Sequence, residues 1–188
     1  GQIRLNNIDI NRLTYQDLRH SVRTVTQEPF LFSDTVENNI AFAIENRPEN
    51  WQEHFPSLLQ QAALREEVDK FPLQEQTIVG EKGILLSGGQ KQRISLARAM
   101  ATSCDLLILD NVLSAVDYET ERYLLQQIFA RRQARSLLIV SHRVTAVEKA
   151  DWILVLDEGR IVAQGTHEEL LQQPGYYQEM WALQHETS

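Results

Sequence analysis

Apolar and polar positions in the second half of the chain follow two different periods in turn. Residues 106–109 and 137–140 are short apolar runs, and the stretch between them, 119–132, has helical spacing. This order predicts a strand, a helix and a second strand. We therefore expect two parallel strands joined by a right-handed crossover, which places the chain in the α/β class.

Alternation at the two ends of the chain predicts hairpins. Residues 3–10 alternate around Asn6 and Asn7, two residues that tolerate the positive φ angles of a tight turn. Residues 152–164 alternate on both sides of a central Asp-Glu-Gly sequence, which is a second hairpin signal. Both hairpins are antiparallel additions to the parallel strands.

Helix caps mark three further elements. Thr14 precedes a short helical pattern, and a strand is expected after it at 22–26. Thr166 and Glu169 have the spacing of a capping box. A last helix is expected at 176–184, after a Pro-Gly pair.

The composition changes between residues 48 and 72, where helix formers dominate and strand signals are absent. Pro56 stands near the start of one amphipathic pattern and Pro72 beyond its end. The apolar positions of this pattern are Leu58, Leu59, Ala62, Ala63 and Val68. We interpret the segment as a helical subdomain inserted into the α/β core, with a further helix at 90–100.

Length and charge narrow the function classes. The chain has 188 residues, 43% of them hydrophobic, which is enough for one core. Its formal charge of −8 argues against binding nucleic acid through the overall field. No apolar run has the length of a membrane span and no signal peptide is visible, so we expect a soluble, cytosolic domain. The single cysteine, Cys104, excludes an internal disulfide and is interpreted as a small packed side chain.

The most specific chemical signal is the run Leu-Ser-Gly-Gly-Gln at 86–90. A glycine pair that opens a helix exposes backbone N–H groups at the positive end of the helix dipole, which suits a phosphate. Ser87 has two roles open to it: it can cap the helix or donate to a γ-phosphate oxygen.

A candidate metal ligand closes the apolar run that follows. We expect strand 106–109 to be buried on both faces and to present Asp110 at the carboxyl edge of the sheet. An apolar run that ends in Asp is common. Its place after the glycine-rich helix makes Asp110 a candidate for positioning Mg²⁺.

These motifs, in this order, resemble the nucleotide-binding domain of an ABC transporter. The matching positions are the signature motif at 86–90, the Walker B acid Asp110, the D-loop acid Asp117, the switch histidine His142 and the Q-loop glutamine Gln27. The stretch 79–83 resembles a loop that exporters carry beside the signature. This stretch narrows the resemblance to multidrug- or lipid-type exporters.

The resemblance implies a P-loop NTPase-like fold, with a mainly parallel sheet, an antiparallel N-terminal portion and an inserted α-helical subdomain. Residues 1–44 would form the sheet core and the Q-loop, 45–100 the helical subdomain with the signature motif, and 101–188 the core with Walker B, the D-loop and the switch histidine. The Gly-x-x-x-x-Gly-Lys-Ser/Thr loop that holds the β- and γ-phosphates in this family is absent from the 188 residues. The sequence thus resembles a domain cut after its P-loop helix, and we expect it to bind ATP weakly on its own.

The resemblance also implies ATP and Mg²⁺ as cofactors. Asp110 and Gln27 would hold the metal, and His142 would contact the γ-phosphate and the attacking water. The residues implied in nucleotide binding are Ser87, Gly88, Gly89, Gln90, Gln27 and Asp117. Expected partners are a second nucleotide-binding domain, packed head to tail, and the coupling helices of a transmembrane domain at the cytoplasmic face of the membrane. No nucleic acid is expected.

Asn111 departs from the family, which places a catalytic glutamate at this position. A carboxamide can hydrogen-bond a water but cannot take its proton at neutral pH. The pattern resembles the degenerate half of a heterodimeric exporter, and an engineered carboxylate-to-amide change would give the same sequence. We expect energy coupling in an ABC exporter, with an ATP clamp that completes a partner's active site as the alternative. The acidic charge argues against a third interpretation, a soluble DNA-repair ATPase.

Residues 30–36 are unusually apolar for a loop. Two interpretations stay open: the aromatic side chains pack in the core, or they form an exposed patch for another protein. The second interpretation predicts that Phe30, Leu31 and Phe32 lie partly exposed, where exporters contact their membrane domain.

Overall fold

The computed structural model describes residues 1–130 and 134–186, and the chain divides into two compact units, Gly1–Leu138 and Ile139–Ser188. Within the described residues, no helix is long and apolar enough to cross a membrane.

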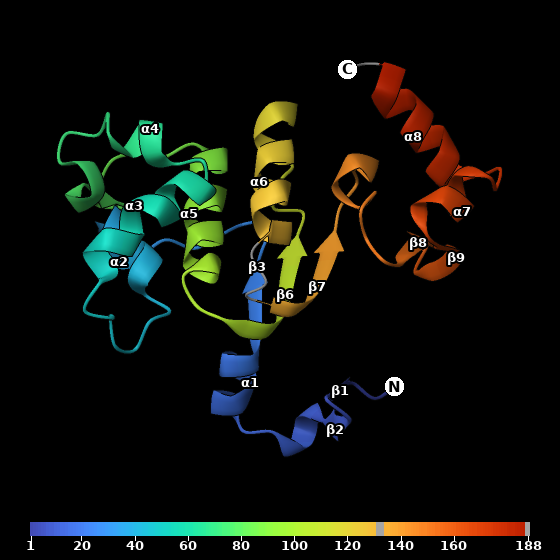
Figure 1. Ribbon diagram of the computed structural model, residues 1–188, viewed down its shortest axis with the longest axis horizontal. Coiled ribbons are helices and arrows are strands. Elements are labelled where there is room, and N and C mark those ends of the chain that lie inside the picture. Colours follow the sequence, from blue (N-terminus) through green and yellow to red (C-terminus); the bar gives the residue numbers. More distant parts are fainter. Residues whose placement is uncertain (131–133, 187–188) are drawn as a thin grey trace. The chain divides into compact units, whose positions relative to one another are not determined.

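A three-stranded sheet forms the centre of the first unit. Its strands β3 (Val22–Val25), β6 (Cys104–Asp110) and β7 (Ala134–Val140) lie in the order β3-β6-β7, and β3 is parallel to β6. The arrows of β6 and β7 point the same way in Figure 1, and α6 (Tyr118–Ala130) connects these two strands. The predicted strand–helix–strand unit is therefore confirmed. The last residues of the predicted helix, 131–132, lie outside the described residues.

Strand β6 is less buried than we expected. Leu107 and Leu109 are buried, whereas Leu106 and Ile108 on the other face are only half-buried. The prediction that this strand is buried on both faces was therefore wrong, because one face of β6 is only half-buried. Cys104, at the start of β6, is also half-buried, and burial raises the pKa of its thiol. This environment favours the thiol over the reactive thiolate.

The N-terminal part follows its local signals. Strands β1 (Arg4–Leu5) and β2 (Ile8–Asp9) form the predicted antiparallel hairpin, and Asn6 and Asn7 both have positive φ angles. After the 3₁₀ helix η1 (Ile10–Arg12), α1 (Tyr15–Ser21) begins at the predicted cap, Thr14, whose hydroxyl accepts from the N–H of Asp17.

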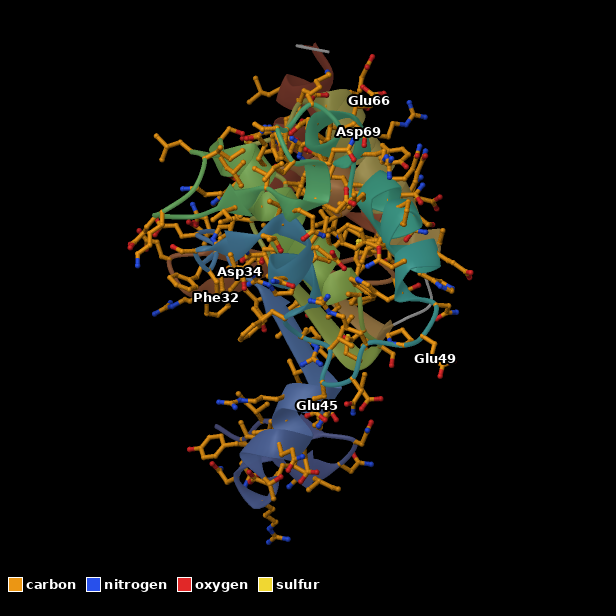
Figure 2. All side chains as sticks on the ribbon, turned by 90° about the vertical axis from the view of Figure 1, so that its left-hand side faces the viewer. Phe32, Asp34, Glu45, Glu49, Glu66 and Asp69 are labelled. Atoms are coloured by element: carbon orange, nitrogen blue, oxygen red, sulfur yellow. The ribbon has the colours of Figure 1, made fainter. Side chains whose placement is uncertain are left out.

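A short helix that the sequence pattern did not predict follows the apolar loop. Helix α2 (Val36–Ala41) comes directly after β4 (Asp34–Thr35), which pairs with β5 (Ile78–Val79). Figure 2 shows Phe32 and Asp34 close together on the segment that leads into α2. α2 packs against α5 (Gly88–Met100), which is the predicted helix at 90–100 with an earlier start.

The segment between 48 and 72 is helical as predicted, but its amphipathic pattern is divided between two helices. α3 (Trp51–Gln61) starts well before Pro56, and α4 (Arg65–Val68) follows a break at Ala63. Ala63 has a φ of +53°, which no α-helix can contain. The break lets Leu59, Leu64 and Val68 all point inward, and each is at most 1% exposed.

A buried carboxylate joins α2 to α3 and to η2 (Gln74–Gln76). Glu37 is 3% exposed, and it accepts hydrogen bonds from the Trp51 indole at 2.7 Å and from the Gln76 amide at 2.6 Å. Gln52 and Arg47 donate to the same carboxylate at 3.1 and 3.3 Å. A buried charge is tolerated only when it is so paired, and this one holds three elements together.

The second unit has its own small core. Strands β8 (Ile153–Asp157) and β9 (Arg160–Gly165) form the predicted hairpin through Glu158 and Gly159, both at positive φ. η3 (Val144–Ala146), α7 (His167–Leu171) and α8 (Tyr176–Glu186) complete the unit, and α7 has the predicted capping box. The core is made by buried side chains from η3, β8, α7 and α8: Val144, Ile153, Val155, Leu170 and Tyr177.

Candidate functional site

The signature run forms the N-terminus of α5. Ser87 is the N-cap: its hydroxyl accepts from the N–H of Gln90 at 3.2 Å, and the Gln90 side chain accepts from the N–H of Ser87 at 2.9 Å. Accepting leaves the Ser87 hydroxyl hydrogen free to donate elsewhere. Both roles predicted for Ser87 are therefore compatible at one side chain.

The two glycines of the signature have different surroundings. A Cβ atom added to Gly88 would meet no atom within 4 Å, so Gly88 borders open space. A Cβ on Gly89 would lie 2.8 Å from the backbone oxygen of Ala115. Gly88 thus leaves room for a group from outside, whereas Gly89 allows the segment after β6 to pack against the helix.

Gln27 and Asp110 lie at the same edge of the sheet. In the parallel pairing of β3 with β6, Val25 is opposite Leu109, so both strands end together. Asp110 is the last residue of β6 and Gln27 follows the end of β3, and both residues are exposed. This is the carboxyl edge at which ligands bind in open α/β sheets.

A glutamine from α5 also contacts this edge. Gln92 is 5% exposed, and its side-chain N–H donates to the backbone oxygen of Gln27 at 3.1 Å. The helix that begins with the signature run is therefore hydrogen-bonded to the segment that carries Gln27.

Asn111 makes a left-handed turn directly after Asp110. Its φ is +50°, and its backbone oxygen accepts from the hydroxyl of Ser114 at 2.9 Å. Asparagine adopts this conformation more readily than glutamate does. The turn buries Val112 and Leu113, at 3% and 5% exposure, and leaves the Asn111 side chain half-buried.

Asp117 has a local role that the sequence pattern did not indicate. Its carboxylate accepts from the N–H of Thr120 at 2.9 Å and from the Thr120 hydroxyl at 2.8 Å, at the start of α6. These hydrogen bonds from Thr120 hold the pKa of Asp117 below its usual value. The residue is exposed, so the cap leaves it accessible to a second chain.

His142 lies in the second unit, just after β7, and its side chain is exposed. Its backbone oxygen accepts from the side-chain N–H of Gln184 at 3.1 Å. The Gln184 side-chain oxygen accepts from the N–H of Val144 at 2.8 Å. One side chain of α8 thus hydrogen-bonds on both sides of Arg143.

Hydrogen bonds from Arg98 and Asn39 fix the backbone of the apolar loop after Gln27. Arg98 donates to both the backbone oxygen and the side-chain oxygen of Asn39, at 2.7 and 3.0 Å, and to the backbone oxygen of Phe30 at 3.1 Å. Asn39 in turn exchanges hydrogen bonds with the backbone of Phe32. The Arg98 guanidinium lies 5.7 Å from the ring centres of both Phe32 and Phe42.

The exposure of this loop decides between its two interpretations. Phe30 and Phe42 are 68% and 62% exposed, and Phe32 is 36% exposed, so an aromatic patch does face outward. Leu31 is 8% exposed and belongs to the core, so the prediction for that residue was wrong. Adjacent residues of an extended segment point to opposite sides, which accounts for the difference.

The donor set at the sheet edge fits Mg²⁺. In the described part of the chain, no three His, Cys, Asp or Glu side chains are grouped in a way that would hold a metal ion by themselves. Mg²⁺ bound with a nucleotide needs only one or two protein oxygens, because phosphates and water supply the rest. Asp110 carries a carboxylate and Gln27 an amide oxygen, which are ligands of the kind that Mg²⁺ accepts.

Comparison with known proteins identifies the family of this chain. A family model described as "ABC transporter" matches residues 1–114. The chain belongs to the ABC transporter family. The matched range contains the signature run, Asp110 and Asn111.

The similar proteins include a multidrug resistance-like ATP-binding protein, a lipid A-core flippase and an ABC exporter. The chain is 41% identical over 184 residues to the multidrug resistance-like ATP-binding protein MdlA of Escherichia coli, covering 98% of this chain and 31% of that protein. It is 42% identical to an ATP-dependent lipid A-core flippase of Pseudomonas putida, covering 97% and 30%. A bacterial Atm1-family ABC exporter with ATP bound superposes with a TM-score of 0.89 at 35% identity, over 98% of this chain and 32% of that one. The chain thus spans about a third of the length of these relatives. It is an exporter-type nucleotide-binding domain.

Three residues of the site were missed in the sequence. Gln92, Arg98 and Gln184 matter through contacts with residues that are distant in the sequence. A signal was present for Gln92, a polar residue on the buried side of α5, and for Arg98, which is half-buried and stands between Ala97 and Ala99. A buried polar side chain requires a partner, but the sequence does not identify that partner.

Proposed function

We propose that this chain couples ATP binding and hydrolysis to transport across a membrane, as a nucleotide-binding domain of a multidrug- or lipid-type exporter. The observation that carries the proposal is the N-terminus of α5, where a capped helix presents Gly88 to open space. Such a helix end binds an anion through its N–H groups and its dipole.

The nucleotide at the signature would be held by a second domain. Ser87, Gly88 and Gln90 face outward or are only half-buried, so their polar groups are available to the phosphates of a nucleotide bound to a head-to-tail partner. Gly89 supports this surface from behind, through its contact with Ala115. Asp117, exposed at the cap of α6, would contact the partner as well.

The chain's own site would use the other motif residues. Asp110 and Gln27 would hold Mg²⁺, which neutralises charge on the phosphates when it is bound. His142 would donate a hydrogen bond to the γ-phosphate. Asn111 can orient a water molecule but cannot accept its proton, so hydrolysis at this site should be slow.

A second candidate function is an ATP clamp, in which the partner site hydrolyses and this chain's own site only retains ATP. The left-handed turn at Asn111 favours it, since glutamate would be strained there. In this case too, the chain would complete the partner's active site. The chain would then be the degenerate half of a heterodimer.

The aromatic patch of Phe30, Phe32 and Phe42 would receive a coupling helix of the transmembrane domain, at the cytoplasmic face of the membrane. Its support is the polar pair beneath it: Arg98 and Asn39 fix the loop backbone while the rings stay exposed. The helices between 45 and 100 would form the subdomain that surrounds this contact. An exposed aromatic patch of this kind marks a protein-binding surface.

The test uses the full-length parent protein assembled with its partner subunit in lipid vesicles. Photoactivatable azido-ATP with Mg²⁺ should label this chain, and Asp110→Asn should reduce the label severalfold. Asp157→Asn is the matched control, because Asp157 is also an exposed aspartate at the end of a strand. Undiminished labelling in Asp110→Asn would contradict the proposed site. Retained ADP on this chain would indicate hydrolysis at its own site, whereas retained ATP would indicate the clamp.

A further inference from the structure

One side chain of the C-terminal helix α8 hydrogen-bonds to two backbone groups of the segment that follows β7. Gln184 donates to the backbone oxygen of His142 at 3.1 Å and accepts from the N–H of Val144 at 2.8 Å. These contacts join residues 42 and 40 positions apart. All three residues belong to the second unit.

The helix that carries Gln184 is firmly anchored. Tyr177 of α8 is 6% exposed and lies in the core with Val144, and its hydroxyl is 2.8 Å from the ring nitrogen Nδ1 of His167. Burial raises the pKa of Tyr177 to about 12, so the phenol stays neutral in this core. Trp181 of the same helix packs on this core too.

Helical spacing places Gln184 on the anchored face of α8. Positions Tyr177, Trp181 and Gln184 are four and then three residues apart, so they lie along one side of the helix. The Gln184 amide is therefore held at a set distance from the core that also contains Val144.

The amide of Gln184 satisfies both backbone groups. The His142 carbonyl needs a donor and the Val144 N–H needs an acceptor, and a glutamine provides one of each in a single plane. Val144 is 6% exposed, so water cannot easily replace the lost acceptor for its N–H.

We propose that Gln184 is a positioning residue for His142, so that the C-terminal helix sets the place of the switch histidine. The inference rests on the proposed role of His142 at the γ-phosphate. His142 has an exposed side chain, and its backbone hydrogen bond to Gln184 limits where that side chain can reach. A change that displaces α8 would then weaken retention of nucleotide at this chain's own site.

The test again uses the full-length parent protein with its partner. Gln184→Met keeps the length of the side chain and removes both hydrogen bonds. Gln184→Glu keeps the acceptor for Val144 but places a carboxylate oxygen against the His142 carbonyl. Gln178→Met is the matched control, because Gln178 is exposed on the same helix.

Both Gln184 variants should retain roughly tenfold less azido-ATP on this chain, as expected when one or two net hydrogen bonds are lost. Initial binding of ATP in the cold should change less than twofold, because Asp110 and Gln27, the other residues proposed for this site, are unchanged. Hydrogen exchange should be faster at the Val144 amide in Gln184→Met and unchanged in Gln178→Met. In the double variant with His142→Ala, the Gln184 change should cause no further loss.

The outcomes separate the inference from the function on which it rests. If His142→Ala reduces retention but Gln184→Met and Gln184→Glu leave it at the wild-type level, the inference is overturned and the role of His142 stands. Additive losses in the double variant also overturn it. If His142→Ala itself has no effect, the proposed role of His142 fails, and the inference fails with it.

Discussion

Gly88→Asp is the sharpest test of the signature surface, because the chain itself has no steric reason to reject it. The Cβ atom would meet nothing within 4 Å, and Gly88 is not among the glycines at positive φ. An aspartate in the first turn of α5 interacts favourably with the helix dipole, by about 0.3–1 kcal/mol. The variant should therefore fold and melt at or slightly above the temperature of the parent protein.

Its effect on a nucleotide held by the partner should have the opposite sign. At about 5 Å from a phosphate oxygen, one added negative charge costs about 1 kcal/mol in water and about 3 kcal/mol at the effective dielectric constant of a protein surface. This range corresponds to roughly five- to 150-fold weaker retention at the partner's site. The large effect on one site, without loss of stability, is what distinguishes a binding surface from a packing position.

The assay measures azido-ATP trapped on each subunit of the full-length assembly, together with the thermal unfolding midpoint. Gln16→Asp is the matched control, since Gln16 is exposed in the first turn of α1 and gains the same charge. Gly89→Ala is the contrasting variant: its Cβ would press on the Ala115 oxygen, so both stability and trapping should fall. Wild-type trapping on the partner in Gly88→Asp would refute the reasoning about this helix end.

Three further predictions follow from the same site. Asn111→Glu in the full assembly should raise hydrolysis at this chain's own site by up to about 10²–10⁴-fold, as expected when a general base is restored. Because glutamate is strained in the left-handed turn, the same change should lower the free energy of unfolding by about 1 kcal/mol. Trapped ADP on this subunit measures the first effect and thermal melting the second, and an inert site would contradict the assignment of Asn111. Asp117→Ala should lower the melting temperature at pH 7, because the pKa of Asp117 is depressed in the folded chain. The stabilisation is present above the unfolded pKa of 3.8 and is lost as the pH falls through the lower folded pKa. The difference in melting temperature from the parent should therefore vanish in acid, and a difference that persists there would contradict the capping role. The 188-residue chain alone should release negligible phosphate in a steady-state ATPase assay. A turnover in the usual enzyme range of about 1–10³ s⁻¹ would contradict this prediction.

Elements stabilised by neighbours in the sequence were predictable, and elements stabilised by distant residues were not. The hairpin at Asn6 and Asn7 and the caps at Thr14 and Thr166 depend on local φ angles and hydrogen bonds, and all of them are present. The helix α2 was missed because it is held by Arg98, 59 residues beyond Asn39. The break at Ala63 was missed for a similar reason, since its carbonyl accepts from Arg93 of α5 at 2.7 Å.

The sequence by itself determined the family, because its motifs are chemical groups in a particular order: a glycine pair at a helix start, an aspartate after an apolar run, and an asparagine where a glutamate is usual. Only the tertiary structure decided which of these groups are accessible. Gly88 is open while Gly89 is packed against Ala115, and no property of two adjacent glycines could have distinguished them. The difference arises because steric contact and hydrogen bonding act between segments that the fold brings together, and spacing along the chain does not encode those contacts directly.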